Sequence, residues 1–135
     1  MLDPAPESSG RAGALSATLS SPAPDVRLLT VAGEVDTLTA PRLADGLTGL
    51  LDDERSTPVV DLADVSFLAS SGLAVLIRAA HRATGQGRAL HLVATSRAVT
   101  RPLEITGSDR LFEMHSGLEE VLTGGGSGPA PRGAD

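Results

Sequence analysis

The sequence predicts an α/β fold with a mostly parallel sheet that follows an opening β-hairpin. Along the chain, segments in which apolar and polar residues alternate, as in strands, are followed by segments with the apolar spacing of helices. Strands joined through a helix normally lie parallel, because the crossover returns the chain to the same end of the sheet. The two opening strands lack such a helix and should pair antiparallel.

The hairpin comes first. Apolar Leu15, Ala17 and Leu19 alternate with polar residues, which indicates a short strand at the edge of the sheet. The proline-rich segment 21–25 has the composition of a turn. Residues 26–31 are rich in apolar and β-branched side chains and should pair back on the first strand.

A helix and a buried strand follow the hairpin. Pro41 favours a helix start, since the N–H that proline lacks has no partner in the first turn anyway. Leucines then recur with helical spacing and form one apolar stripe: Leu43, Leu47, Leu50 and Leu51. The acidic run 52–54 ends this helix, and a buried strand opens at Val59 and runs into Asp61.

The next helix has the clearest pattern. One face carries Leu73, Leu76, Ile77, Ala80 and Thr84. Ser70 or Ser71 can serve as the N-cap, because a serine oxygen accepts a hydrogen bond from a free backbone N–H group. Gly85 is a natural C-terminal stop. The two phenylalanines, Phe67 and Phe112, are expected in the core.

Four shorter elements complete the prediction. They are a strand, a helix, a strand and a last helical turn, over 90–93, 96–105, 111–114 and 118–122. Within the second of these, Pro102 should delay the regular helix until about Arg101. His81 and His91 are expected at exposed positions.

Composition delimits one domain between two tails. The chain has 135 residues, which is the length of one domain. Residues 1–13 and 123–135 are rich in proline, glycine and polar residues, and both are expected to be disordered. Residues 14–122 contain the periodic segments and should form the folded domain.

Charge and residue content argue against several functions. The net charge of −6 and the absence of a basic patch argue against nucleic-acid binding. There is no cysteine, and the three histidines are scattered, so neither a disulfide nor a metal site is expected. No phosphate-binding loop, dinucleotide motif or nucleophile–base pair is recognisable. We therefore expect no cofactor, no catalytic residues and no enzymatic activity.

The sequence also predicts a cytoplasmic location. No apolar stretch approaches the roughly 18 residues of a membrane span. The first residues lack a basic stretch followed by an apolar run, so a signal peptide is not expected.

One segment, from Asp61 to Leu73, has residues that suggest chemistry: a buried strand ends, a short connection follows, and two serines open an amphipathic helix. Ser70 has two interpretations. As an N-cap it would contribute about 1 kcal/mol to stability. As a phosphorylation site it would place roughly −1.5 to −2 charges at a helix N-terminus, where phosphate is favoured. Such a charge could switch off a docking surface without refolding the domain.

The stretch from Asp61 to Leu73 resembles the motif of STAS domains, particularly bacterial anti-anti-sigma factors of the sporulation and stress-response type. The Gly-Glu-Val-Asp run at 33–36 and the segment 99–112 are similar to two further family motifs. The resemblance covers about residues 14–122, with the three motifs in the family's order. It implies a single STAS domain with a mixed sheet of about five strands and helices packed on one face.

In that branch of the family, the resemblance implies partner switching. The unphosphorylated protein would bind an anti-sigma factor, a serine kinase of the histidine-kinase-like ATPase type, and so release a sigma factor for transcription. The kinase would phosphorylate Ser70, and a PP2C-type phosphatase would reverse the modification. The expected partner-binding residues are Glu34, Asp36, Ala69, Ser70, Ser71 and Gly72.

Ala69 departs from the family, which has an aspartate before the phosphorylated serine. This departure keeps a second function open: a STAS scaffold, or a subunit of a stressosome-like or lipid-transport ATPase complex, without a phosphorylation switch. Glu34 and Asp36 also have a structural interpretation, in which they solvate a loop and cap the next segment. Arg78 and Arg82 are expected on a solvated helix face rather than in a docking patch.

Overall fold

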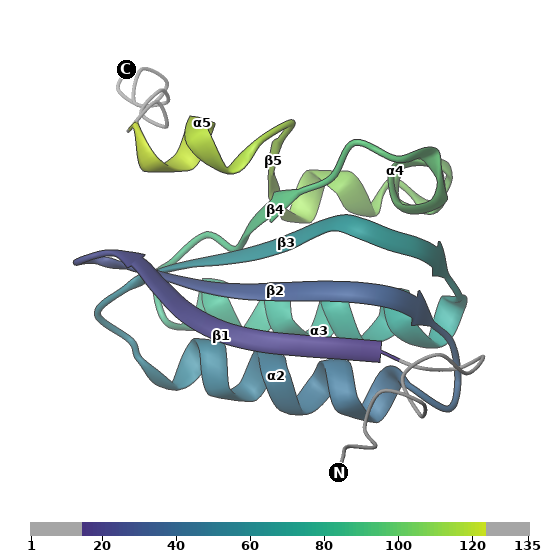
Figure 1. Cartoon of the computed structure of the whole chain (residues 1–135), viewed down its shortest axis with the longest axis horizontal. Coiled ribbons are helices and arrows are strands. Elements are labelled where there is room, and N and C mark those ends of the chain that lie inside the picture. The colour runs from purple at the N-terminus through teal and green to yellow at the C-terminus, as the bar shows by residue number, and fades with distance from the viewer. Residues whose placement is uncertain (1–14, 124–135) are drawn as a thin grey trace, which may run out of the picture.

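A five-stranded sheet in the order β1-β2-β3-β4-β5 organises the computed structural model, which describes residues 15–123 (Figure 1). The strands are β1 (Leu15–Ala23), β2 (Val26–Val35), β3 (Thr57–Leu68), β4 (His91–Val93) and β5 (Glu113–His115). β1 pairs antiparallel with β2, and the remaining neighbours are parallel. The predicted α/β fold with a mixed sheet is therefore confirmed. Apart from Thr123, the tails predicted at 1–13 and 123–135 lie outside the described residues.

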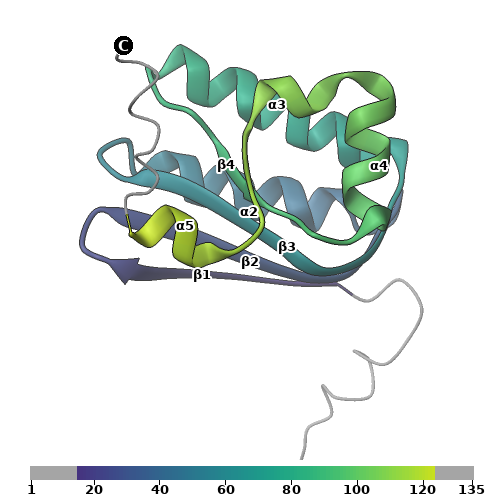
Figure 2. The same ribbon diagram turned by 90° about the horizontal axis from the view of Figure 1, so that it is seen from above.

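The helices are α2 (Ala40–Asp52), α3 (Ser70–Gly85), α4 (Arg97–Thr106) and α5 (Leu118–Leu122), with a 3₁₀ turn η1 (Ser108–Leu111). α2 and α3 run side by side along one face of the sheet (Figures 1 and 2). No helix within the described part of the chain is long and apolar enough to cross a bilayer.

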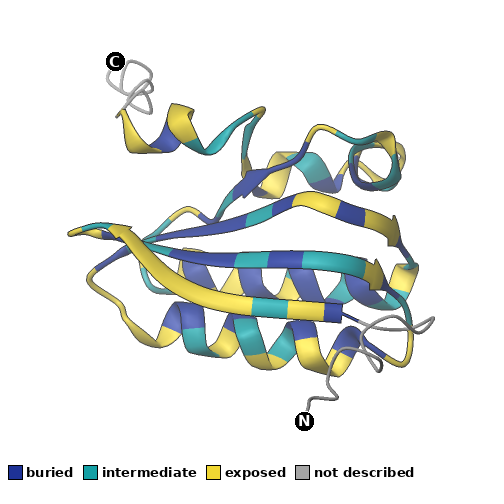
Figure 3. Ribbon diagram, in the orientation of Figure 1, coloured by how far each residue is buried: buried dark blue, intermediate teal, exposed yellow. Residues whose placement is uncertain are grey.

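The main core lies between the sheet and helices α2 to α4, and β2 and β3 contribute several buried positions each (Figure 3). It is built from leucine, valine and alanine, with Phe112 as its aromatic member. Each fully buried leucine or valine contributes about 1.5–3 kcal/mol relative to an exposed one. The opposite face carries a smaller cluster, in which Val121 of α5 packs on Val26, Leu28, Val59 and Val93. The helices expected on one face are thus α2 to α4, and α5 is an addition on the other.

β2 and β3 are much longer than the sequence predicts. β3 continues past Asp61 to Leu68, and β2 continues to Val35. Two irregularities in their pairing interrupt the alternation of apolar and polar residues by which a strand is recognised in a sequence. The hydrogen-bonded ladder nevertheless continues to the Val35–Leu68 pair. The segment before Ser70, predicted as a connection, is therefore strand.

α4 begins at Arg97, so the prediction that Pro102 delays the regular helix to Arg101 is wrong. The Ser96 carbonyl accepts the N–H groups of Val99 and Thr100, at 3.1 and 3.0 Å, and these bonds start the helix before the proline. Gly107 ends it at a left-handed φ of 75°.

Candidate functional site

The predicted site residues lie at one edge of the sheet, where β2 and β3 end and α2 and α3 begin (Figure 1). Val35 pairs with Leu68 in the last rung of the ladder. The N–H of Ala69 then donates to the Val35 carbonyl at 2.8 Å. This bond fixes the start of α3 against the end of β2.

Ser70 is the first residue of α3 and is exposed. The N-cap is Ala69, whose φ and ψ of −82° and 168° are extended, and no side chain caps the helix. The prediction that Ser70 or Ser71 is the N-cap is therefore wrong, because both already have helical backbone. The Ser70 hydroxyl is not used to cap the helix, which leaves it available for chemistry.

Ser71 and Gly72 face the interior of the protein. The Ser71 Oγ is buried and has no hydrogen-bond partner among the described residues. Gly72 is buried, and a Cβ there would lie 2.2 Å from Val35 Cγ1 and 3.0 Å from Leu68 Cδ1. Gly72 therefore lets α3 pack closely on the ends of β2 and β3, a requirement of packing rather than of binding.

Asp36 holds the start of α2. Its Oδ1 accepts the N–H groups of Leu38 and Thr39, each at 3.0 Å, and lies 3.1 Å from the Thr39 hydroxyl oxygen. The N–H of Asp36 donates back to Thr39 Oγ1 at 2.9 Å, and that hydroxyl donates to the Glu34 carbonyl at 2.8 Å. The Asp36 carboxylate thus holds the turn that leads into α2, although no side chain caps the helix itself.

Glu34 belongs to β2 rather than to a loop, and it is exposed beside Phe67, its neighbour in the ladder. Phe67 is 50% exposed, so the prediction that it lies in the core is wrong, whereas Phe112 is buried as predicted. The side chains of a strand alternate between faces, and Leu68 takes the inward direction. Sequence analysis missed Phe67 as a surface residue because it had assigned no strand there.

A groove of about 440 Å³ lies beside Ser70, between α4 on one side and the end of β3 and the start of α3 on the other. Its β3 and α3 side is formed by Phe67, Leu68, Ala69, Ser70 and Leu73. Its α4 side, which the sequence analysis did not connect with Ser70, is formed by Arg97, Ala98, Arg101, Pro102, Ile105 and Thr106. Ser70 therefore lies at an apolar hollow that carries two arginines.

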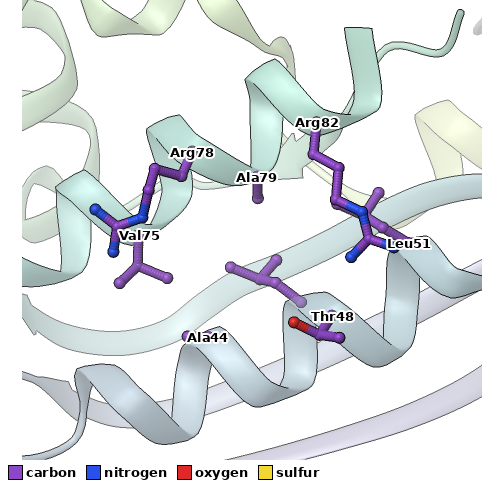
Figure 4. A pocket seen from close by; sticks show the side chains of 8 residues that line it. Ala44, Thr48, Leu51, Val75, Arg78, Ala79 and Arg82 are labelled. Atoms are coloured by element: carbon purple, nitrogen blue, oxygen red, sulfur yellow. The ribbon is translucent and has the colours of Figure 1, made fainter. Parts of the chain in front are cut away.

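Arg78 and Arg82 line a second, smaller hollow of about 150 Å³ between α2 and α3 (Figure 4). Arg82 Nη2 lies 2.9 Å from Asp52 Oδ1 and links the two helices. Both partners of this pair are well exposed, so it contributes at most about 1 kcal/mol. The structure agrees with the predicted solvated face.

His91 is partly buried, so its predicted exposure is wrong, while His81 is exposed as predicted. The Nδ1 of His91 lies 2.9 Å from Nε2 of His115, and the two rings are stacked. Burial lowers the pKa of His91, and the neighbouring His115 lowers it further. His91 pairs with Val59 near the start of β3, at the end of the strand away from Ser70. The described residues contain no group of histidines and carboxylates that could hold a metal ion.

Comparison with known proteins relates this geometry to a family. The model of the STAS domain matches residues 22–121. The anti-sigma-F factor antagonist RsfB of Mycobacterium tuberculosis is 33% identical over 99 residues, which cover 73% of this chain and 80% of RsfB. The anti-sigma-B factor antagonist of Staphylococcus aureus is 30% identical over 89 residues, 66% of this chain and 82% of the relative.

A solved structure is also similar. The anti-sigma factor antagonist from Mycobacterium paratuberculosis superposes with a TM-score of 0.74 at 29% identity, over 82% of this chain and 92% of that one. The family model covers nearly all of the residues that the structure describes, including both helix starts at the candidate site. The chain therefore belongs to the STAS domain family.

Proposed function

We propose that this protein is an anti-sigma factor antagonist, a binding protein that docks an anti-sigma factor on the surface around Ser70 and so releases a sigma factor. The observation that carries the proposal is the exposed Ser70 hydroxyl at the first position of α3, next to exposed apolar side chains. Phe67, Ile105 and Leu38 are 50%, 71% and 85% exposed. Exposed apolar groups gathered at one edge are typical of a protein-binding surface. The names of the two relatives point to the same class of partner.

Phosphorylation of Ser70 is the switch in this proposal. A phosphate would add roughly −1.5 to −2 charges at the centre of the docking surface. The free N–H groups at the start of α3 would stabilise that charge, so the domain would keep its fold. An interface that must desolvate the region around Phe67 would be lost, because burying an unpaired charge is unfavourable.

The partner that would phosphorylate Ser70 is, in this proposal, the anti-sigma factor itself, acting as a serine kinase with ATP. A PP2C-type phosphatase would remove the phosphate. Ser70 is accessible to both, since its side chain is exposed and makes no capping bond.

Ala69 supports a second candidate. The aspartate that the family places before the phosphorylated serine is absent, and α3 has no side-chain cap. A kinase that requires this aspartate would not modify Ser70. The protein would then be a STAS scaffold or a subunit of a stressosome-like or lipid-transport ATPase complex.

The test uses the full chain with each serine-kinase-type anti-sigma factor encoded in the same genome. We expect one of them to bind the wild type and Ser70→Ala, and to bind Ser70→Asp at least about tenfold more weakly. Ser20→Asp is the matched control, because Ser20 is exposed on β1. With ATP, mass spectrometry should find phosphate on Ser70 of the wild type.

Two results would contradict the proposal separately. Equal binding of wild type and Ser70→Asp, with no phosphate on Ser70, would remove the switch. Binding to no anti-sigma factor, together with co-purification with a transporter ATPase, would favour the second candidate.

A further inference from the structure

Helix α4 has an unusual distribution of side chains. Its buried stripe consists of Val99 and Leu103. A second stripe follows the i, i+4 spacing of one helix face and lines the groove: Arg97, Ala98, Arg101, Pro102 and Ile105. A helix that only covers a core presents polar residues outward, whereas Ile105 is 71% exposed. The face of α4 that lines the groove thus combines apolar side chains with two arginines.

The groove is also locally positive. Arg97 and Arg101 are exposed, and neither forms an ion pair within residues 15–123. The residues that line the groove include no carboxylate. This arrangement contrasts with the net charge of −6 of the whole chain. Arginine forms bidentate hydrogen bonds with carboxylates, so the groove favours an acidic group placed beside an apolar one.

We infer that this groove between β3 and α4 receives a segment of the anti-sigma factor that carries an apolar side chain next to an aspartate or glutamate. The apolar side chain would pack on Phe67, Leu73 and Ile105, and the carboxylate would pair with Arg97 or Arg101. This inference rests on the proposed function and adds the chemistry by which the partner is recognised.

The groove also connects recognition with the switch. Ser70 lines it, so a phosphate there would stand among the groups that meet the partner's carboxylate. The two negative groups would compete for the same positive field. The docking segment and the phosphate should therefore exclude one another without a change of fold.

The experiment measures the dissociation constant of the full chain with the anti-sigma factor that binds the wild type. Arg101→Glu and Ile105→Ser should each weaken binding about tenfold or more. Arg78→Glu and Leu122→Ser are the matched controls, because they make the same changes at exposed positions away from the groove. Each control should change binding less than about twofold. Reversal of one acidic residue of the anti-sigma factor to arginine should restore binding to Arg101→Glu.

Failure of the inference can be told apart from failure of the proposed function. If Ser70→Asp abolishes binding while Arg101→Glu and Ile105→Ser bind as the wild type does, the groove inference alone is overturned. If no anti-sigma factor binds the wild type, both fall. If ultracentrifugation shows that the chain self-associates and that Ile105→Ser prevents it, the groove holds a second copy, which also overturns the inference.

Discussion

The starts of α2 and α3 lie at the same edge of the sheet, but their polar side chains are used in opposite ways. At α2, Asp36 and Thr39 exchange hydrogen bonds with each other and with the backbone. At α3, Ser70 is exposed and makes no capping bond; α2 also lacks a side-chain cap, so the difference lies in the hydrogen-bonded turn before α2. The polar groups before α2 thus hold a turn, whereas at α3 Ser70 is exposed and the Ser71 Oγ is buried. In our proposal, the exposed Ser70 is the group that a partner or a kinase meets.

The largest loss of stability should follow substitution of Gly72, because the missing Cβ lets the start of α3 pack closely on Val35. Gly72→Val should lower the free energy of unfolding by about 3 kcal/mol, because its Cβ would overlap Val35. Chemical denaturation measures this loss. Gly85→Ala is the control, since a Cβ there meets no atom within 4 Å. A Gly72→Val variant as stable as the wild type would show that the start of α3 is not closely packed.

The turn before α2 should show the next largest loss of stability. Asp36→Ala removes the acceptor of two backbone N–H groups in this turn and should cost about 1–2 kcal/mol. Thermal unfolding would report the loss as a lower Tm. Asp45→Ala is the control, because Asp45 is exposed within α2 and is not at its start. Equal Tm values for the two variants would contradict the structural role of Asp36.

The start of α3 should gain stability when a cap is supplied. Ala69→Asp places a carboxylate at a residue that already has extended backbone, so it should add about 1 kcal/mol. Denaturation of Ala69→Asn separates capping from charge, since asparagine caps without a charge. A loss of stability in both variants would contradict the prediction that a capping side chain at position 69 stabilises α3.

The smallest effect is expected for Ser70 itself. Ser70→Ala removes a hydroxyl that does not cap the helix and should change the free energy of unfolding by less than about 0.5 kcal/mol. Thr39→Ala is the matched comparison, because the Thr39 hydroxyl accepts the N–H of Asp36 and donates to the Glu34 carbonyl. If the two alanine variants lost the same stability, the contrast between the helix starts would disappear.

Sequence patterns alone were enough to predict the order of the elements, the apolar stripe of α2, and the position of Ser70 near a helix start. The stripe of α3 was predicted only in part, since Thr84 is exposed whereas Val75, Ala79 and Ala83 are buried. These features depend on local periodicity and on single residue types, which can be recognised without knowing what packs against them. The family motif at 61–73 likewise needed only contiguous residues.

The length of β3, the exposure of Phe67 and the groove beside Ser70 depend on long-range packing and could not be predicted from the sequence. β3 continues past Asp61 because β2 supplies its hydrogen-bond partners, and this pairing turns Phe67 outward. Arg101 and Ile105 line the same groove as Ser70, although α3 and β4 separate them from it along the chain. Contacts between residues so distant in sequence leave no periodic signal, because they arise when helices pack on a sheet.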